Sequence, residues 1–214
     1  MDPAAPSTTA TRLPGATPGA LHAICGCMFA GKTETLIDIV QSVSPNRVRV
    51  FKHVIDDRYD PRRVVSHRQR SCDATPINDA DAVLRGLEPG VRLVGVDEGH
   101  FFDARLITVC QTLVARGVDV TVTALDRDCW GRPFDVVAAL CAVADRVTIK
   151  HGQCARCGAA SERTQRLIPI VGKNLVGGCE AFEPRCVQCW TAPPTPDQIT
   201  RPASNTGPCV QHNS

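Results

Sequence analysis

Residues 26–33 read Gly26-Cys27-Met28-Phe29-Ala30-Gly31-Lys32-Thr33, and this stretch decides the fold. It matches G-x-x-x-x-G-K-[ST], a loop whose backbone N–H groups surround nucleotide phosphates. An ordinary glycine-containing turn is the alternative, but the flanking residues disfavour it. The apolar run 21–25 is typical of a strand, and residues 34–40 are typical of the start of a helix. The sequence therefore predicts a strand, a phosphate loop and a helix, with ATP or GTP as the ligand.

The rest of the chain predicts an α/β fold with a parallel sheet. Strand-like apolar runs alternate with amphipathic stretches at 48–51, 80–86, 93–96, 106–116, 118–124 and 136–144. This alternation is typical of a parallel sheet covered by helices. We therefore predict a P-loop NTPase-like core that is followed by a small zinc-binding subdomain.

Composition divides the chain into four predicted parts. Residues 1–19 and 191–214 are rich in small residues and proline without usable periodicity, which predicts two disordered tails. Residues 20–150 are the predicted P-loop α/β domain. The sequence changes character after Lys150, so residues 151–190 are predicted to form the zinc-binding subdomain.

Charge and hydropathy argue against several classes of partner. The chain has 24 basic and 22 acidic residues and a net charge of +2, which favours small substrates over nucleic acid or a membrane surface. No apolar run approaches the ~20 residues that span a bilayer, and the first residues lack a signal-peptide pattern. We expect a cytoplasmic protein, in the cytosol or nucleus.

Four of the twelve cysteines have metal-ligand spacing. They form two pairs, Cys154-x-x-Cys157 and Cys186-x-x-Cys189. A disulfide framework is the alternative, but it suits short secreted chains, whereas this chain lacks a signal and carries a nucleotide loop. Two such pairs predict a closed, structural site in which four thiolates hold one Zn²⁺.

The run 93–98 is predicted to be a buried strand that ends in two adjacent carboxylates, Asp97 and Glu98. It resembles a Walker B strand, in which the Asp supports Mg²⁺ and a neighbouring carboxylate can polarise the nucleophile. One of the two carboxylates could instead be a helix N-cap or a surface charge. The phosphate loop upstream favours the magnesium site.

The motifs taken together resemble the type II thymidine kinases, the family of the cellular cytosolic enzyme. Asp97-Glu98-Gly99-His100-Phe101-Phe102 is similar to the family's D-E-[GA]-Q-F-[FL]. Further matches follow the family's order at 56–59, 66–68, 125–128, 131–134, 164–167 and 177–186. The resemblance runs from about residue 20 to 190, and both cysteine pairs fall where the family holds its structural zinc.

The resemblance implies transfer of the ATP γ-phosphate to the 5′-hydroxyl of thymidine. Lys32 is expected to pair with the β and γ phosphates, Thr33 to bind Mg²⁺, and Glu98 to accept the hydroxyl proton. Arg58, unless it is a surface charge, is expected to spread the charge of the transferring group. The residues expected to be catalytic are Glu98, Lys32 and Arg58. Those expected to bind ATP and Mg²⁺ are Gly26, Cys27, Met28, Phe29, Ala30, Gly31, Lys32, Thr33, Asp56, Asp57, Arg58, Asp97, Glu98, Gly99 and His100.

The resemblance also implies a nucleoside pocket, closed by a loop at 173–177 that binds thymine largely through its backbone. Its apolar wall residues could instead belong to the core. Those expected to contact substrate are Met28, Phe102, Leu125, Cys129, Phe134, Arg166, Lys173, Asn174, Leu175, Val176, Gly177 and Phe182.

Three residues depart from the family near the substrate: His100 replaces Gln, Cys129 replaces Phe and Phe182 replaces Tyr. Loss of the ring at position 129 predicts a wider pocket. The resemblance as a whole implies a thymidine kinase that forms a homotetramer. The alternatives are a broader deoxynucleoside kinase and a zinc-containing, nucleic-acid-binding P-loop ATPase. An inactive descendant is disfavoured because Lys32 and Glu98 are both present.

Overall fold

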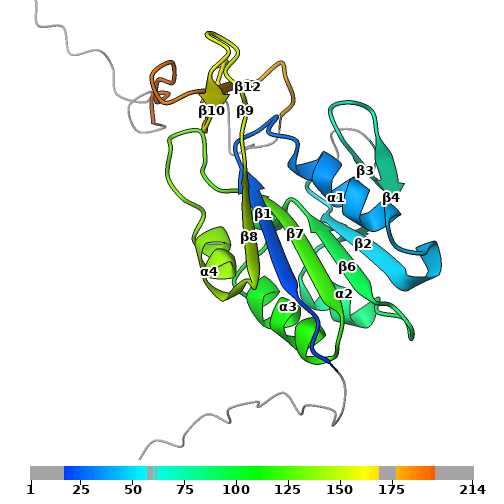
Figure 1. Cartoon of the computed structure of the whole chain (residues 1–214). Helices are drawn as coiled ribbons and strands as arrows, with labels where there is room; N and C mark the ends of the chain where they lie inside the picture. The colour runs from blue at the N-terminus through cyan, green and yellow to red at the C-terminus, as the bar shows by residue number, and fades with distance from the viewer. Residues whose placement is uncertain (1–16, 57–59, 61, 169–176, 196–214) are drawn as a thin grey trace, which may run out of the picture.

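Six parallel strands form the central sheet of this computed structural model, which describes residues 17–56, 60, 62–168 and 177–195 (Figure 1). The strand order is β5-β2-β6-β7-β1-β8, and every neighbouring pair is parallel. The strands are β1 (Leu21–Gly26), β2 (Val48–His53), β5 (Thr75–Ile77), β6 (Leu93–Asp97), β7 (Asp119–Leu125) and β8 (Arg146–Lys150). The predicted α/β fold with a parallel sheet is confirmed.

Helices cover both faces of the sheet. One face packs against α1 (Lys32–Gln41), and the other against α2 (Asp81–Arg85), α3 (Arg105–Ala115) and α4 (Asp135–Val143) (Figure 1). Side chains alternate along each strand, so Val94 and Val96 face α3 while Gly95 faces α1. A Cβ on Gly95 would lie 3.1 Å from Leu36 Cδ1, so its absence lets α1 approach the sheet closely.

The elements that the hydrophobic pattern predicted are present. The runs at 48–51, 93–96 and 118–124 form strands, and those at 80–86, 106–116 and 136–144 form helices. Sequence analysis did not identify β5 and β8, which are the two edge strands of the sheet. It also missed the antiparallel hairpin of β3 (Arg63–Val65) and β4 (Ser71–Asp73).

Two short antiparallel sheets follow β8, at the top of Figure 1. In the first, β9 (Gly152–Gln153) pairs with β10 (Ala160–Ser161); in the second, β11 (Arg163–Arg166) pairs with β12 (Phe182–Arg185). One-turn helices lie at η1 (Pro45–Arg47) and η2 (Gly99–Phe101). Most of each predicted tail, residues 1–16 and 196–214, lies outside the described residues, and the four-part division stays a prediction.

Candidate active site

The phosphate loop joins the end of β1 to the start of α1. Gly26, at φ +144°, leaves no room for a side chain, because a Cβ there would lie 2.2 Å from the carbonyl oxygen of Lys150. Gly31, at φ 77°, caps the N-terminus of α1. Lys32 is buried, and its Nζ donates a hydrogen bond to the carbonyl oxygen of Cys27 at 2.7 Å. The loop therefore surrounds a helix N-terminus, where backbone N–H groups and the helix dipole favour phosphate.

A cavity of about 600 Å³ lies over this loop. Residues 28–35 line it from the loop and α1, residues 66–68 and 150–153 from outside the loop, and Glu98 and Leu125 complete its wall. Sequence analysis quoted residues 66–68 as a motif but did not assign them to the site, and it missed residues 150–153. Residues 150–153 could have been found only from their position after β8, a strand that the hydrophobic pattern did not reveal.

Asp97, at the end of β6, lies directly beside the phosphate loop. It is buried, and its Oδ1 accepts hydrogen bonds from the hydroxyls of Thr123 and Thr33, with Thr33 Oγ1 at 3.4 Å. A carboxylate and a hydroxyl at the mouth of a phosphate site are hard oxygen ligands of the kind that Mg²⁺ prefers. The residues present therefore fit a magnesium ion bound with nucleotide phosphates.

Glu98 has a left-handed backbone conformation, with φ 53°. Non-glycine residues in this region are uncommon and cost about 1–3 kcal/mol, and they cluster at functional sites. The Glu98 side chain is only 12% exposed, and its Oε2 lies 3.5 Å from Nδ1 of His100. The backbone N–H of Leu125 donates a hydrogen bond to the same Nδ1, at 3.3 Å.

A second cavity, of about 180 Å³, adjoins the first and shares Met28 and Leu125 with it. Aromatic rings form much of its wall. The His100 ring packs against those of Phe101 and Phe134, with centroids 4.2 and 4.9 Å apart. The described residues that line the cavity are Met28, His100, Phe101, Leu125, Arg127, Asp128, Cys129, Phe134, Thr164 and Phe182. Its size and apolar, aromatic walls suit a planar base.

The structure brings together five of the predicted nucleoside-pocket residues: Met28, Leu125, Cys129, Phe134 and Phe182. Burial raises the pKa of the Cys129 thiol, and the nearby Asp128 adds to this against the opposing effect of Arg166. The thiol is therefore protonated at neutral pH, and it contributes a small, uncharged side chain to the wall of the second cavity.

Other predicted residues lie elsewhere. Phe102 is buried in the hydrophobic core on the face of the sheet that packs against α3, and it does not line the second cavity. Its ring lies edge-on to that of His53, with the two centroids 4.9 Å apart. Instead Phe101, which sequence analysis passed over, faces that cavity. His100, which was expected on the ATP side, lines the second cavity and is not among the residues that line the first. The cause is η2, which turns the chain directly after Glu98 and ends the strand alternation.

The remaining predicted residues lie beside the cavities or outside the described residues. Asp56 is buried and forms an ion pair with Lys52 at 3.7 Å. Arg166 lies behind the cavity wall, with its guanidinium carbon 5.4 Å from the centre of the Phe182 ring. Gly177 packs directly against that ring. The predicted residues outside the described part are Asp57, Arg58, Lys173, Asn174, Leu175 and Val176.

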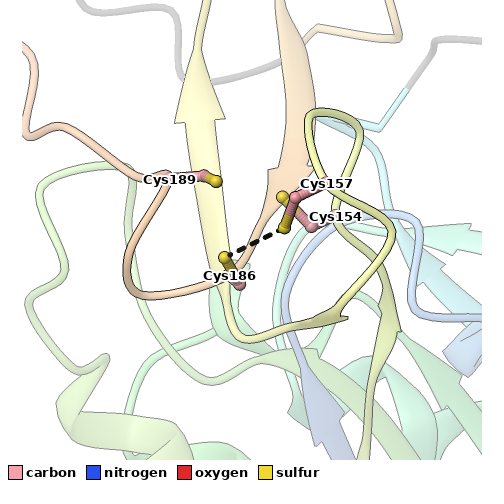
Figure 2. A group of neighbouring side chains, drawn as sticks. All are labelled: Cys154, Cys157, Cys186 and Cys189. Carbon is pink, nitrogen blue, oxygen red and sulfur yellow. Dashed lines mark hydrogen bonds between the residues drawn. The ribbon is translucent and has the colours of Figure 1, made fainter.

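The four paired cysteines lie together in space (Figure 2). Their sulfur atoms all lie within 4.8 Å of one another, and those of Cys157 and Cys186 are 3.6 Å apart. Tetrahedral Zn–S bonds would separate such sulfurs by about 3.8 Å. Burial alone would raise the pKa of Cys154, but hydrogen bonds with the backbone of Cys186, Arg156 and Cys157 lower it to about 6. This group of thiols therefore fits zinc.

Among the described residues, no helix combines the length and apolar character that crossing a membrane requires.

Comparison with known proteins supports one family. The family model described as thymidine kinase matches residues 19–190. A thymidine kinase of Bdellovibrio bacteriovorus is 42% identical over 174 residues, 80% of this chain and 85% of that protein. A thymidine kinase of a Rhodothermus species is 40% identical, over 84% of each chain. One of Bacteroides fragilis is 39% identical, over 80% of this chain and 87% of that protein.

A solved structure of the ATPase DotB from Legionella pneumophila covers 54% of this chain and 33% of its own, with a TM-score of 0.35 and 19% identity. That likeness is too slight to support any conclusion. The match to the family model, in contrast, spans the phosphate loop, both carboxylates and all four paired cysteines. The chain therefore belongs to the thymidine kinase family.

Proposed function

We propose that this chain transfers the γ-phosphate of ATP to the 5′-hydroxyl of thymidine, with Glu98 as the general base. One observation carries the proposal: Glu98 lines the phosphate cavity beside Leu125, where that cavity adjoins the aromatic one. A nucleoside in the smaller cavity would direct its sugar toward this junction. A carboxylate there is placed to accept the hydroxyl proton as the oxygen attacks phosphorus.

The phosphate side supplies positive charge and a metal site. Lys32 is proposed to exchange its hydrogen bond to the Cys27 carbonyl for the β and γ phosphates. Thr33 and Asp97 would hold Mg²⁺, which neutralises charge on the phosphates when it is bound. Arg58 is proposed to stabilise the transferring group, on the basis of its sequence motif.

The second subdomain is proposed to carry a structural Zn²⁺ on its four paired cysteines. Residues 173–177 are proposed to form the loop that closes over thymine, as the sequence resemblance implies. The zinc site would hold the two ends of that loop, because one cysteine pair precedes it and the other follows it.

We also propose a homotetramer located in the cytoplasm, with no nucleic-acid or membrane partner. Two features of β8 support self-association: among the described residues it is an edge strand of the sheet, and its Val147 and Ile149 side chains are 43% and 50% exposed. Light scattering coupled to size exclusion would measure the subunit count, and a monomer at micromolar concentration would contradict the tetramer.

Mg²⁺-dependent phosphate transfer tests the assignment of Glu98. We expect wild type to produce thymidine monophosphate and Glu98→Gln to lose about 10²–10⁴-fold in kcat, the usual contribution of a general base. Asp73→Asn, at a carboxylate that is 99% exposed, is the matched control and should keep full activity. Equal activity in wild type and Glu98→Gln would refute the proposed base.

A broader deoxynucleoside kinase is the second candidate, and Cys129 favours it. Its small side chain lines the aromatic cavity where the family has a ring. Deoxyuridine and deoxycytidine should therefore be assayed beside thymidine. If the smaller side chain broadens specificity, Cys129→Phe should narrow it toward thymidine, and an unchanged preference would exclude this role.

A further inference from the structure

The zinc-binding subdomain contacts the first half of the phosphate loop at three consecutive residues. The Sγ of Cys27 lies 3.3 Å from the Oγ of Ser161, on β10. The backbone N–H of Met28 donates to the Oγ1 of Thr164, on β11, at 3.1 Å. These partners are 134 and 136 residues apart in the sequence.

The third contact is backbone against backbone. Gly152, on β9, lies so close to the loop that an added Cβ would be 3.0 Å from the carbonyl oxygen of Phe29 and 3.5 Å from the Cα of Ala30. The same Cβ would also be 3.0 Å from the Oγ of Ser161. The absence of a side chain therefore allows this part of the subdomain to lie against the loop.

Water cannot replace these hydrogen bonds, because the groups that form them are buried. Ser161 is 0% exposed, Cys27 2% and Thr164 4%. The Oγ of Ser161 is itself held by the backbone N–H of Gly152 at 3.0 Å. A buried donor that loses its only acceptor remains unsatisfied, which makes such bonds costly to remove.

The contacts lead directly to the phosphate-binding lysine. The carbonyl oxygen of Cys27, the residue whose thiol meets Ser161, accepts the hydrogen bond from Lys32 Nζ. Ser161 therefore contacts the residue whose carbonyl oxygen holds the lysine side chain. Thr164 fixes the next peptide group, that of Met28, which lines both cavities.

We infer that Ser161 and Thr164 are positioning residues for ATP: the second subdomain holds the phosphate loop in the conformation that binds the nucleotide. This inference rests on the proposed function, since it assigns the loop to ATP. The second subdomain would then act on the phosphate side of the reaction, in addition to the role at the nucleoside that the sequence resemblance implies.

Binding of a non-hydrolysable ATP analogue with Mg²⁺ tests the inference. Calorimetry should be done on zinc-loaded wild type, Thr164→Val and Thr164→Ser. Valine keeps the shape of threonine and removes the acceptor of the Met28 N–H, so we expect about tenfold weaker binding of the analogue. Serine keeps the hydroxyl and should bind the analogue within about twofold of wild type. Thr112→Val, on α3 away from both cavities, is the control for the substitution itself.

The kinetic constants separate positioning from general destabilisation. We expect Thr164→Val to raise KM for ATP more than KM for thymidine, because valine preserves the wall of the nucleoside cavity. A lower Tm with an unchanged dissociation constant for the analogue would overturn the inference. Analogue binding also remains measurable if wild type fails to phosphorylate thymidine, so failure of the proposed function is recognised separately.

A double-mutant cycle provides a second route that does not depend on Thr164. Cys27→Ala and Ser161→Ala should each weaken analogue binding, and the loss in the double variant should be smaller than the sum of the two single losses, because either change removes the contact between the thiol and the hydroxyl. Additive losses would show that the two side chains act independently and would contradict the proposed contact.

Discussion

Replacing Gly26 with alanine should distort the junction of β1 and the phosphate loop. Two costs add at this position. The φ of +144° is a conformation that an L side chain rarely adopts, at about 1–3 kcal/mol. The new Cβ would also lie 2.2 Å from the Lys150 carbonyl oxygen, a backbone atom of β8 that cannot rotate away. Overpacking of this kind costs about 1–3 kcal/mol. The total of about 2–6 kcal/mol is a large part of the 5–15 kcal/mol that stabilises a typical native protein.

Thermal denaturation measures this loss, and Gly90→Ala is the matched control. Gly90 has φ +88° but no atom within 4 Å of an added Cβ, so its substitution incurs only the backbone cost. At about 2–4 °C per kcal/mol, the clash should make the Tm of Gly26→Ala about 2–12 °C lower than that of Gly90→Ala. ATP-analogue binding should weaken only in Gly26→Ala. Equal Tm values for the two variants would refute the reasoning, because the clash at β8 would then contribute nothing.

Three further perturbations address the metal sites and the aromatic cavity. Asp97→Asn should weaken Mg²⁺ activation by about 10- to 100-fold in a metal titration of turnover, and an unchanged Mg²⁺ requirement would remove Asp97 from the metal site. Chelation should release about one Zn²⁺ per chain and lower the Tm, and added zinc should restore the Tm. Cys186→Ser should lower the zinc content and the Tm in the same way. Cys179→Ser, at an exposed thiol outside the cluster, should change neither. Phe101→Ala should raise KM for thymidine several-fold, because an aromatic contact contributes about 0.5–1.5 kcal/mol beyond its buried area. Its Tm should fall less than that of Phe102→Ala, because the cavity that Phe102→Ala leaves in the core should cost about 3–5 kcal/mol. The opposite pattern would show that the two rings had been assigned the wrong way round.

Local spacing allowed the phosphate loop and the cysteine pairs to be predicted from the sequence. A phosphate loop is a contiguous stretch whose backbone binds the ligand, so its glycines and Lys32 are visible in the order in which they act. The same holds for each C-x-x-C turn, whose spacing allows two thiols to bind one metal. The buried strand that ends at Asp97 was recognisable for a similar reason, because strand and carboxylates are adjacent in the chain.

Edge strands were harder to predict, because they are buried on fewer sides. Every residue of β8 is half-buried or exposed, and β5 is three residues long, so neither produces a strong hydrophobic run. Their place in the sheet follows from pairing with β1 and β2, which is a long-range property.

Sequence by itself determined the family, the phosphate loop, the carboxylate pair and the two cysteine pairs, since each motif is encoded in residues that are close together in the chain and the family follows from the order of the motifs. Only the tertiary structure decided which neighbouring ring faces the aromatic cavity, because the turn at 99–101 directs Phe101 to that cavity and leaves Phe102 in the core. It alone also brought Ser161 and Thr164 to the phosphate loop. Contacts across more than a hundred residues depend on how distant segments of the chain pack together, and no local pattern of residue types encodes that packing.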